Sequence, residues 1–206
     1  MDSHTSLFLI RHAEVEERYQ RVFGGRLDIA LSPRGHEQAA QLGTYLRRFR
    51  FVAVYASPMR RVQETLSALV PHQRVSPQVM DDLREVDFGV WTGLRWEEIQ
   101  ERFNVSAFDW LEHLNAGTIP QAETGEELRH RIEPCLRRML GAHSGQSIAV
   151  VCHGGVIRVI LAILLGLPLV RTAGLDIEYA SLTVLHHRPW RSELQLLNFT
   201  PWRDLP

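Results

Sequence analysis

The sequence alternates short, uninterrupted apolar runs with segments of helical spacing, and this alternation limits the fold more than any other feature. Three runs carry almost no polar residue, as expected for strands that are covered on both faces; they span residues 7–10, 51–56 and 147–152. Helical segments follow them at residues 32–49, 60–70 and 155–166. We therefore predict an α/β fold, a three-layer α/β/α sandwich with a mostly parallel central sheet.

Further elements complete this prediction. Ser32 is a suitable N-cap for the first helix, with Pro33 at its first position. The remaining elements are a long helix over residues 124–143 despite Pro134, a weaker strand over 74–80, and two strands over 180–187 and 193–200. The last two are close enough to form an antiparallel edge pair. No internal repeat or linker is visible, so residues 1–206 are expected to form one domain.

The charge balance excludes several classes of partner. A formal net charge of -1 and a pI of about 6.8 give no electrostatic case for nucleic acid or an acidic membrane. The most apolar segment, residues 156–170, is too short and too interrupted to span a bilayer, and no secretory signal begins the chain. Two cysteines do not make a disulfide framework, so a reducing cytoplasm is the expected setting. The sequence does not reveal the oligomeric state, and a homodimer is the default guess.

Every one of the 23 basic residues is an arginine. Without lysine, the chain can neither form a Schiff base through its side chains nor supply the lysine of a P-loop. The simplest explanation is the base composition of the genome.

Polar residues gather where the predicted strands end. They are Arg11 and His12, the segment "SPMRR" at 57–61, and His153 with Gly154 and Gly155. In open parallel sheets, ligands bind beyond the carboxyl ends of the strands. Guanidinium groups match phosphate oxygens, and the bare start of a helix adds N–H donors. The sequence therefore predicts a phosphate site.

A histidine at such a site can attack phosphorus, because neutral imidazole is nucleophilic near pH 7. Glu85, in "LREVDFGVWTG", is our candidate for the acid that protonates the leaving oxygen. Each of these residues could also have a purely structural role. A lone histidine after a strand is more often a hydrogen-bonded structural residue than a nucleophile, and Arg60 is expected on a solvated helix face. Asp82 and Asp87 are expected at the surface or as caps.

Together these residues resemble the histidine phosphatase superfamily, also called phosphoglycerate-mutase-like. Four ordered blocks carry the resemblance: R-H-G-x-[ST] at 11–15, S-P-L-x-R-A at 57–62, L-x-E-x-x-x-G-x-W-x-G at 83–93 and [ST]-H-G-G-V-I-R at 152–158. The segment "TGEEL" at 124–128 is similar to a fifth sequence block of the family, its G-E-S segment. The short stretch between Trp91 and this segment resembles the compact phosphatase branch, so hydrolysis is predicted rather than mutase activity.

The resemblance implies His12 as the phosphorylated nucleophile and Glu85 as general acid and then base. It also implies that no metal and no cofactor are required. It implies Arg11, Arg61 and His153 as phosphate ligands, and it places Gly154 at the same site. Gly24 and Gly25 align with a loop whose backbone faces substrate, although a plain turn would explain them equally.

Cys152 and Glu127 depart from the family pattern in the fourth block and in "TGEEL", and three further departures lie near the expected phosphate. Ala13 replaces a glycine, Val15 replaces a hydroxyl residue, and Arg18 replaces an asparagine that contacts phosphate. Arg18 either supplies a further cation to the substrate or points outward.

Four alternatives stay open at this point. "CHGGVIR" has the C-x-x-G-x-x-R spacing of a cysteine-dependent phosphatase, with Cys152 as nucleophile and Arg158 as phosphate ligand. A mutase, a metal hydrolase and a non-catalytic phosphate-binding module are the others.

The substrate is expected to be a small phosphomonoester. Aromatic and acidic residues in 92–124 weakly favour a neutral or partly apolar organic group, although Trp96, Ile99 and Phe103 fall at helical spacing and should pack. A sugar phosphate, a nucleotide, α-ribazole phosphate and broad specificity all stay open.

Overall fold

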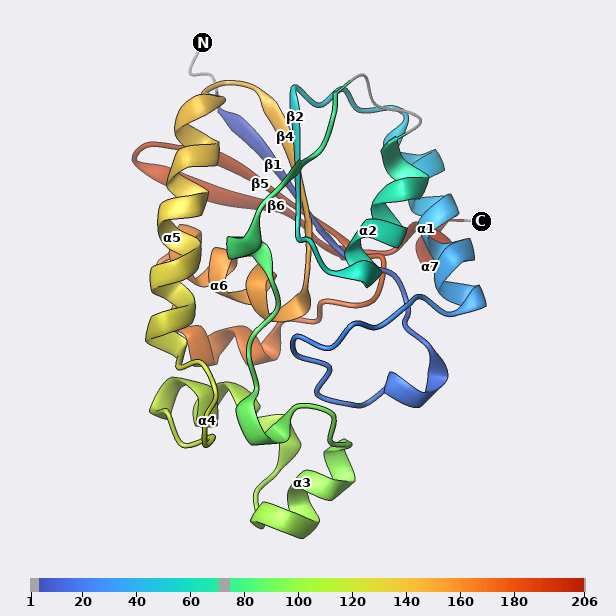
Figure 1. Cartoon of the computed structure of the whole chain (residues 1–206). Helices are drawn as coiled ribbons and strands as arrows, with labels where there is room; N and C mark the ends of the chain where they lie inside the picture. Colours follow the sequence, from blue (N-terminus) through green and yellow to red (C-terminus); the bar gives the residue numbers. More distant parts are fainter. Residues whose placement is uncertain (1–3, 71–74, 206) are drawn as a thin grey trace.

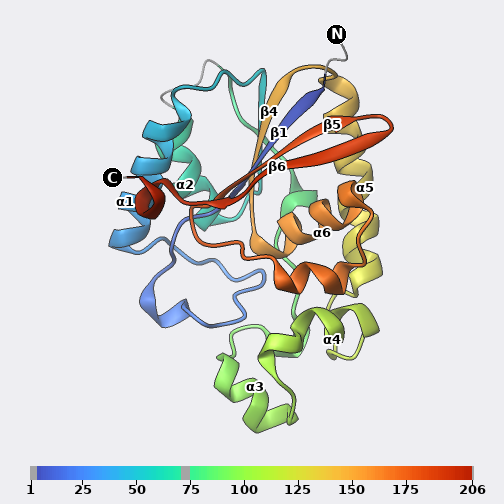
Figure 2. The ribbon, with the colours of Figure 1, turned by 180° about the vertical axis from the view of Figure 1, so that it is seen from behind.

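The computed structural model describes residues 4–70 and 75–205, and these residues form a six-stranded sheet in the order β3-β2-β4-β1-β5-β6 (Figure 1). The strands are β1 (Thr5–Arg11), β2 (Ala53–Ala56), β3 (Gln78–Val79), β4 (Ser147–Cys152), β5 (Leu182–Arg188) and β6 (Arg191–Phe199). The first four are parallel, and β5 and β6 extend the sheet as an antiparallel hairpin, which Figure 2 shows from the other side. The predicted mixed sheet with an antiparallel edge pair is confirmed.

Helices cover both faces of this sheet, as predicted. One face carries α5 and α6, and the other carries α1 and α2, on the left and right of Figure 1. The helices are α1 (Pro33–Leu46), α2 (Arg60–Leu69), α3 (Trp96–Phe103), α4 (Trp110–Ala116), α5 (Gly125–Ala142), α6 (Gly154–Leu165) and α7 (Pro201–Asp204). Both cysteines are buried and free, and no helix in the described residues is long and apolar enough to cross a membrane.

The central strands are apolar throughout because their side chains alternate between two cores. Leu7 and Leu9 belong to the core under α5 and α6, whereas Phe8 and Ile10 belong to the core under α1 and α2. All four side chains are at most 5% exposed. Since successive side chains of a strand point to opposite faces, a strand covered on both sides needs apolar residues at every position.

Local capping explains where the helices begin. The Ser32 hydroxyl accepts a hydrogen bond from the Gly35 amide at 2.9 Å, and Pro33 occupies the first position of α1, as predicted. At α5, Thr124 and Glu127 form a reciprocal capping box. The helix then continues through Pro134.

The strand predicted over residues 74–80 is much shorter in the structure. Only Gln78 and Val79 pair with β2, and residue 74 lies outside the described residues. Both paired residues are exposed at the edge of the sheet. Pro77 precedes them and has no N–H to continue the ladder, so the edge strand stays short.

Residues 92–123 build a cap beyond the end of the sheet where the site residues lie. They contain α3 and α4, below the sheet in Figure 1. The cap joins the loop that follows β1, because the Phe23 amide donates to the Leu94 carbonyl at 3.0 Å and Val22 pairs with Arg95.

The packing expected of Ile99 is confirmed, since its side chain is fully buried, and Trp96 packs partly buried against the core. The packing expected of Phe103 is wrong, because its side chain is 37% exposed at the last position of α3. Our sequence analysis did not predict α4.

The close approach of α1 to α2 generates a stability prediction. A Cβ added to Gly43 would lie 2.4 Å from the Ala68 carbonyl oxygen. We expect Gly43→Ala to lower the free energy of unfolding by about 1–3 kcal/mol, because the two helices must separate. Gly141→Ala, in α5, is the matched control: nothing lies within 4 Å of its Cβ, so the better helix propensity of alanine should raise stability by up to about 1 kcal/mol. Urea unfolding measures the free energy of unfolding of both variants. Equal values for Gly43→Ala and Gly141→Ala would contradict the packing argument.

Candidate active site

The parallel pairing of β1 with β4 places two histidines side by side. Arg11 pairs with Cys152 at the ends of these strands, and the His12 amide donates to the Cys152 carbonyl at 3.0 Å. The next residue of each strand is a histidine, and the ring centroids of His12 and His153 lie 5.2 Å apart. Both side chains are buried, at 4% and 0% exposure. The structure thus brings together two residues that are far apart in the sequence.

The hydrogen bond of His12 fixes which ring nitrogen is free. Nδ1 lies 2.9 Å from the carbonyl oxygen of Ala13, and a carbonyl can only accept. Nδ1 therefore carries the proton, and Nε2 keeps its lone pair. Burial lowers the pKa of His12 well below its usual value, and the charges of Arg61 and Arg11 lower it further. The imidazole is consequently neutral near pH 7.

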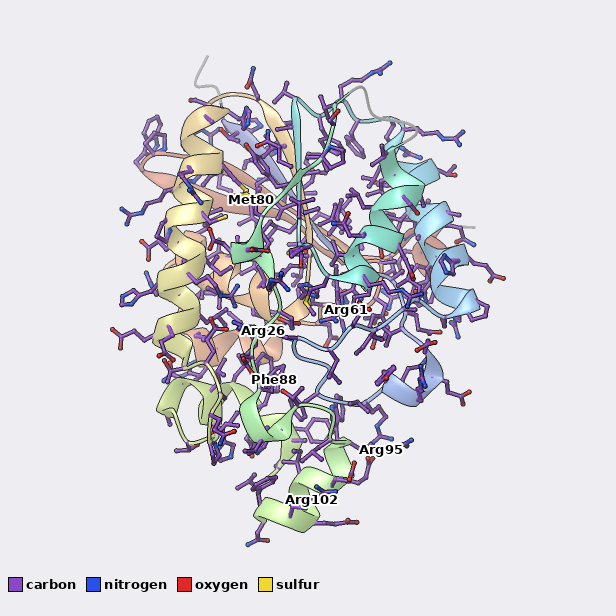
Figure 3. All side chains as sticks on the ribbon, viewed as in Figure 1. Arg26, Arg61, Met80, Phe88, Arg95 and Arg102 are labelled. Carbon is purple, nitrogen blue, oxygen red and sulfur yellow. The ribbon has the colours of Figure 1, made fainter. Side chains whose placement is uncertain are left out.

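Arg61 enters the site from the first turn of α2 and is 3% exposed. It donates to the carbonyls of Gly25 at 2.8 Å and Leu27 at 3.1 Å. Burial lowers its pKa to about 10, although Glu85 opposes the shift, so the guanidinium stays charged at neutral pH. Figure 3 shows Arg61 between the sheet and α3.

Arg11 supplies a second guanidinium at the end of β1. Its Nη1 donates to the Ile177 carbonyl at 2.6 Å, and the group lies 4.1 Å over the Tyr179 ring. Its Nε is buried and has no hydrogen-bond partner in the described part of the chain. A buried donor without a partner is the kind of group that a bound anion would satisfy.

Gly155 allows Glu85 to approach the start of α6. The Gly155 amide donates to one Glu85 carboxylate oxygen at 3.3 Å, and the Val86 amide donates to the other at 3.0 Å. A Cβ on Gly155 would lie 2.5 Å from Oε1 of Glu85 and 2.6 Å from a Val86 methyl. This position needs glycine because of the close approach.

Ser57 follows β2 and orients the second histidine. Its Oγ lies 2.8 Å from Nε2 of His153 and accepts a hydrogen bond from the Met59 amide at 3.3 Å. The serine hydroxyl can donate to Nε2, and in that tautomer the ring proton lies on Nδ1. That Nδ1 is buried with no partner among the described residues. The pKa of His153 lies well below its usual value, mainly because the side chain is buried.

Arg11, His12, Arg61 and Glu85 border a cavity of about 140 Å³, whereas His153 and Ser57 lie behind its lining residues. Its lining includes both arginines, His12, Glu85, Gly24, Gly25, Val15 and Tyr179. Our sequence analysis assigned no role to Tyr179, whose ring lies 5.6 Å from that of His12, because no motif marks the loop before β5. It also assigned none to Ser57, although the serine begins one of the four blocks.

Some predicted residues lie elsewhere. The Arg18 side chain is 69% exposed and forms a 3.0 Å ion pair with Glu16, so the structure does not bring it into the cavity. Arg60 pairs with Glu64 at 2.7 Å on the solvated face expected for it. Asp82 pairs with Arg138 at the surface.

The cysteine alternative has little support in the structure. Cys152 is fully buried, and burial raises the pKa of its thiol far above the physiological range, which disfavours the thiolate. Arg158 donates to the Thr172 carbonyl rather than lying beside the sulfur. As for the metal alternative, the described residues contain no group of three or more His, Cys, Asp or Glu side chains that could hold a metal ion.

Comparisons with known proteins agree on the family. The sequence model of the histidine phosphatase superfamily (branch 1) matches residues 7–200. Phosphoserine phosphatase 1 of Hydrogenobacter thermophilus is 29% identical over 194 residues, which cover 94% of this chain and 92% of that protein. The adenosylcobalamin/alpha-ribazole phosphatase of Escherichia coli is 27% identical over 162 residues, or 79% of this chain and 80% of that protein.

A solved structure extends the agreement to the fold. A mycobacterial glucosyl-3-phosphoglycerate phosphatase superposes with a TM-score of 0.86 at 24% identity, covering 95% of this chain and 99% of that chain.

The burial of Cys152 generates a prediction for activity. We expect Cys152→Ala to keep the kcat of the wild type for p-nitrophenyl phosphate within about twofold, because the thiol is protonated and inaccessible. Cys135→Ala, which removes the other buried thiol, is the matched control. Loss of turnover in Cys152→Ala alone, with an unchanged unfolding transition, would contradict this prediction.

Proposed function

The chain belongs to the histidine phosphatase superfamily, branch 1, and we propose that it hydrolyses a small organic phosphomonoester through a phosphohistidine on His12. One observation carries the proposal. A neutral imidazole whose Nδ1 is held by the Ala13 carbonyl lies beside the buried guanidinium of Arg61 and the partly buried one of Arg11, whose Nε–H has no partner among the described residues. This arrangement supplies a nucleophile and an anion site together.

In the first step, the phosphate binds to Arg11, Arg61 and the Nδ1–H of His153. The lone pair on Nε2 of His12 forms the N–P bond as the ester P–O bond breaks. Protonated Glu85 gives its proton to the departing oxygen, so the product leaves as a neutral alcohol. The guanidinium groups stabilise the charge that develops on the phosphoryl oxygens.

In the second step, the Glu85 carboxylate takes a proton from water. The water oxygen bonds to phosphorus, the N–P bond breaks, and its electron pair returns to Nε2. Inorganic phosphate leaves, and Glu85 is protonated for the next cycle. No step requires a metal or a cofactor. The cytoplasmic location expected from the sequence stays a prediction.

The phosphatase relatives favour hydrolysis over transfer to a second substrate. The protein from Hydrogenobacter is named for phosphoserine and that from Escherichia for α-ribazole, so the alcohols differ while phosphate release is shared. The short cap over residues 92–123 supports the same reading, because a small cap should admit water to the phosphohistidine. Phosphoglycerate mutase turnover faster than phosphate release would favour the mutase alternative.

The acid role of Glu85 can be tested with two leaving groups. We expect Glu85→Gln to reduce kcat/KM for glycerol 3-phosphate about 100-fold or more, and for p-nitrophenyl phosphate much less, because p-nitrophenolate leaves without a proton. The ratio kcat/KM reports the first irreversible step, so slow hydrolysis of the phosphohistidine does not obscure the comparison. Glu126→Gln, at the exposed start of α5, is the control. Equal reductions for both substrates would remove Glu85 from the acid role.

A further inference from the structure

Tyr179 lies beside His12, on the loop that leads into β5. Its ring centroid is 5.6 Å from that of the histidine, and the guanidinium of Arg11 lies 4.1 Å over the same ring. The side chain borders the cavity of about 140 Å³ together with Arg61 and Glu85. Tyr179 therefore faces the groups that would hold and attack a phosphoryl group, although none of the four sequence blocks contains it.

Hydrogen bonds of the main chain hold this loop against the end of β1. The Ala180 amide donates to the His12 carbonyl at 3.1 Å, and the Tyr179 carbonyl accepts a hydrogen bond from the Trp202 indole at 3.1 Å. Ala180 is fully buried and has a φ of 51°, in the left-handed region that a residue with a side chain seldom adopts. Such a conformation persists where the surrounding contacts impose it, and it is frequent at functional sites. The loop thus holds the phenol ring at a fixed place relative to His12.

The hydroxyl of Tyr179 is not used by the rest of the protein. Among the described residues, none forms a hydrogen bond with it, and the side chain is only partly buried. Burial lowers the pKa of Arg61, and after Glu85 the Tyr179 phenol is among the groups that oppose this shift, so it lies within electrostatic range of that guanidinium. A phenol O–H can donate one hydrogen bond to an oxygen that enters the cavity.

The loop after β1 leaves a place for such a donor. Val15 lines the cavity with an apolar side chain where the family pattern has a hydroxyl residue. Arg18 lies outside in its ion pair with Glu16, where that pattern has an amide. The three non-bridging oxygens of a phosphoryl group carry negative charge, and hydrogen bonds to charged oxygens are the strong ones. A neutral donor on the loop before β5 would take over part of the role that these two positions have lost.

Tyr179 belongs to the phosphate end of the site. A second cavity, of about 380 Å³, shares Arg11 and Glu85 with the first. Because Glu85 borders both, an ester oxygen that it protonates would lie at their junction, with the alcohol in the second cavity. Tyr179 lines the first cavity, and the described lining of the second does not include it. Any effect of its hydroxyl should therefore be the same for every alcohol that leaves.

We propose that the hydroxyl of Tyr179 donates a hydrogen bond to a phosphoryl oxygen of the bound substrate. This inference rests on the proposed phosphatase function. It adds a neutral phosphate ligand to the guanidinium groups of Arg11 and Arg61, while the ring of the same tyrosine supports Arg11 through a cation–π contact.

Tyr179→Phe tests the hydroxyl alone, because phenylalanine keeps the ring under Arg11. We expect the inhibition constant for inorganic phosphate to rise about tenfold, since a hydrogen bond to a charged oxygen is lost. We also expect kcat/KM to fall by a similar factor for both p-nitrophenyl phosphate and glycerol 3-phosphate. An unchanged inhibition constant would overturn the proposal, and so would a reduction of kcat/KM confined to one of the two substrates.

Tyr45→Phe is the matched control. Tyr45 also lies under a guanidinium, that of Arg48, which is 4.2 Å from its ring centroid. It packs against Phe199, and the described lining of neither cavity includes it. This variant should leave the inhibition constant and both values of kcat/KM unchanged. Equal effects of the two variants would overturn the proposal, because the loss would then not belong to the phosphate site.

The proposed function fails separately. A wild type that does not hydrolyse p-nitrophenyl phosphate, or a His12→Ala variant that still does, would contradict that function. Hydrolysis that depends on His12 but not on the hydroxyl of Tyr179 would overturn the tyrosine ligand alone.

Discussion

The register of β1 against β4 is the constraint on which the site depends. Parallel hydrogen bonding ends the two strands at the same level, so the residues that follow them, His12 and His153, leave the sheet as neighbours. The pairing of β2 with β4 places Ser57 at the same edge. A slip of one residue between these strands would turn each side chain to the other face of the sheet. The two cores that the strand side chains fill therefore fix the register, and the register fixes which residues meet at the site.

Burial gives these neighbours their chemistry. Both imidazoles are kept neutral by desolvation and by the guanidinium groups around them, and the Ala13 carbonyl fixes the proton of His12 on Nδ1. Main-chain carbonyls, rather than carboxylates, accept the hydrogen bonds of Arg11 and Arg61. The positive charges of both guanidinium groups therefore remain available to a bound anion. Gly155 completes the arrangement by admitting Glu85 to the start of α6.

The sequence predicts the parts of this structure that follow from local patterns. Apolar runs and caps were enough to place the sheet, α1, α5 and α6, and strand-end residues indicated the cluster at His12. The outward position of Arg18 was not predictable, because it depends on an ion pair with Glu16 that has no motif. Tyr179 was missed because it reaches the site only through the β5 pairing, a long-range contact. Ser57 was visible in a block, but its role depends on a distance to His153.

The central claim is that the phosphoryl group passes through a covalent bond to nitrogen on His12. The most direct measurement is rapid quenching of the enzyme during turnover of a 32P-labelled phosphomonoester, followed by mapping of the labelled peptide. We expect label on the peptide that contains His12, stable in alkali, lost in acid and absent from His12→Ala. Label on the peptide that contains Cys152, or phosphate release at the wild-type rate from His12→Ala, would contradict it.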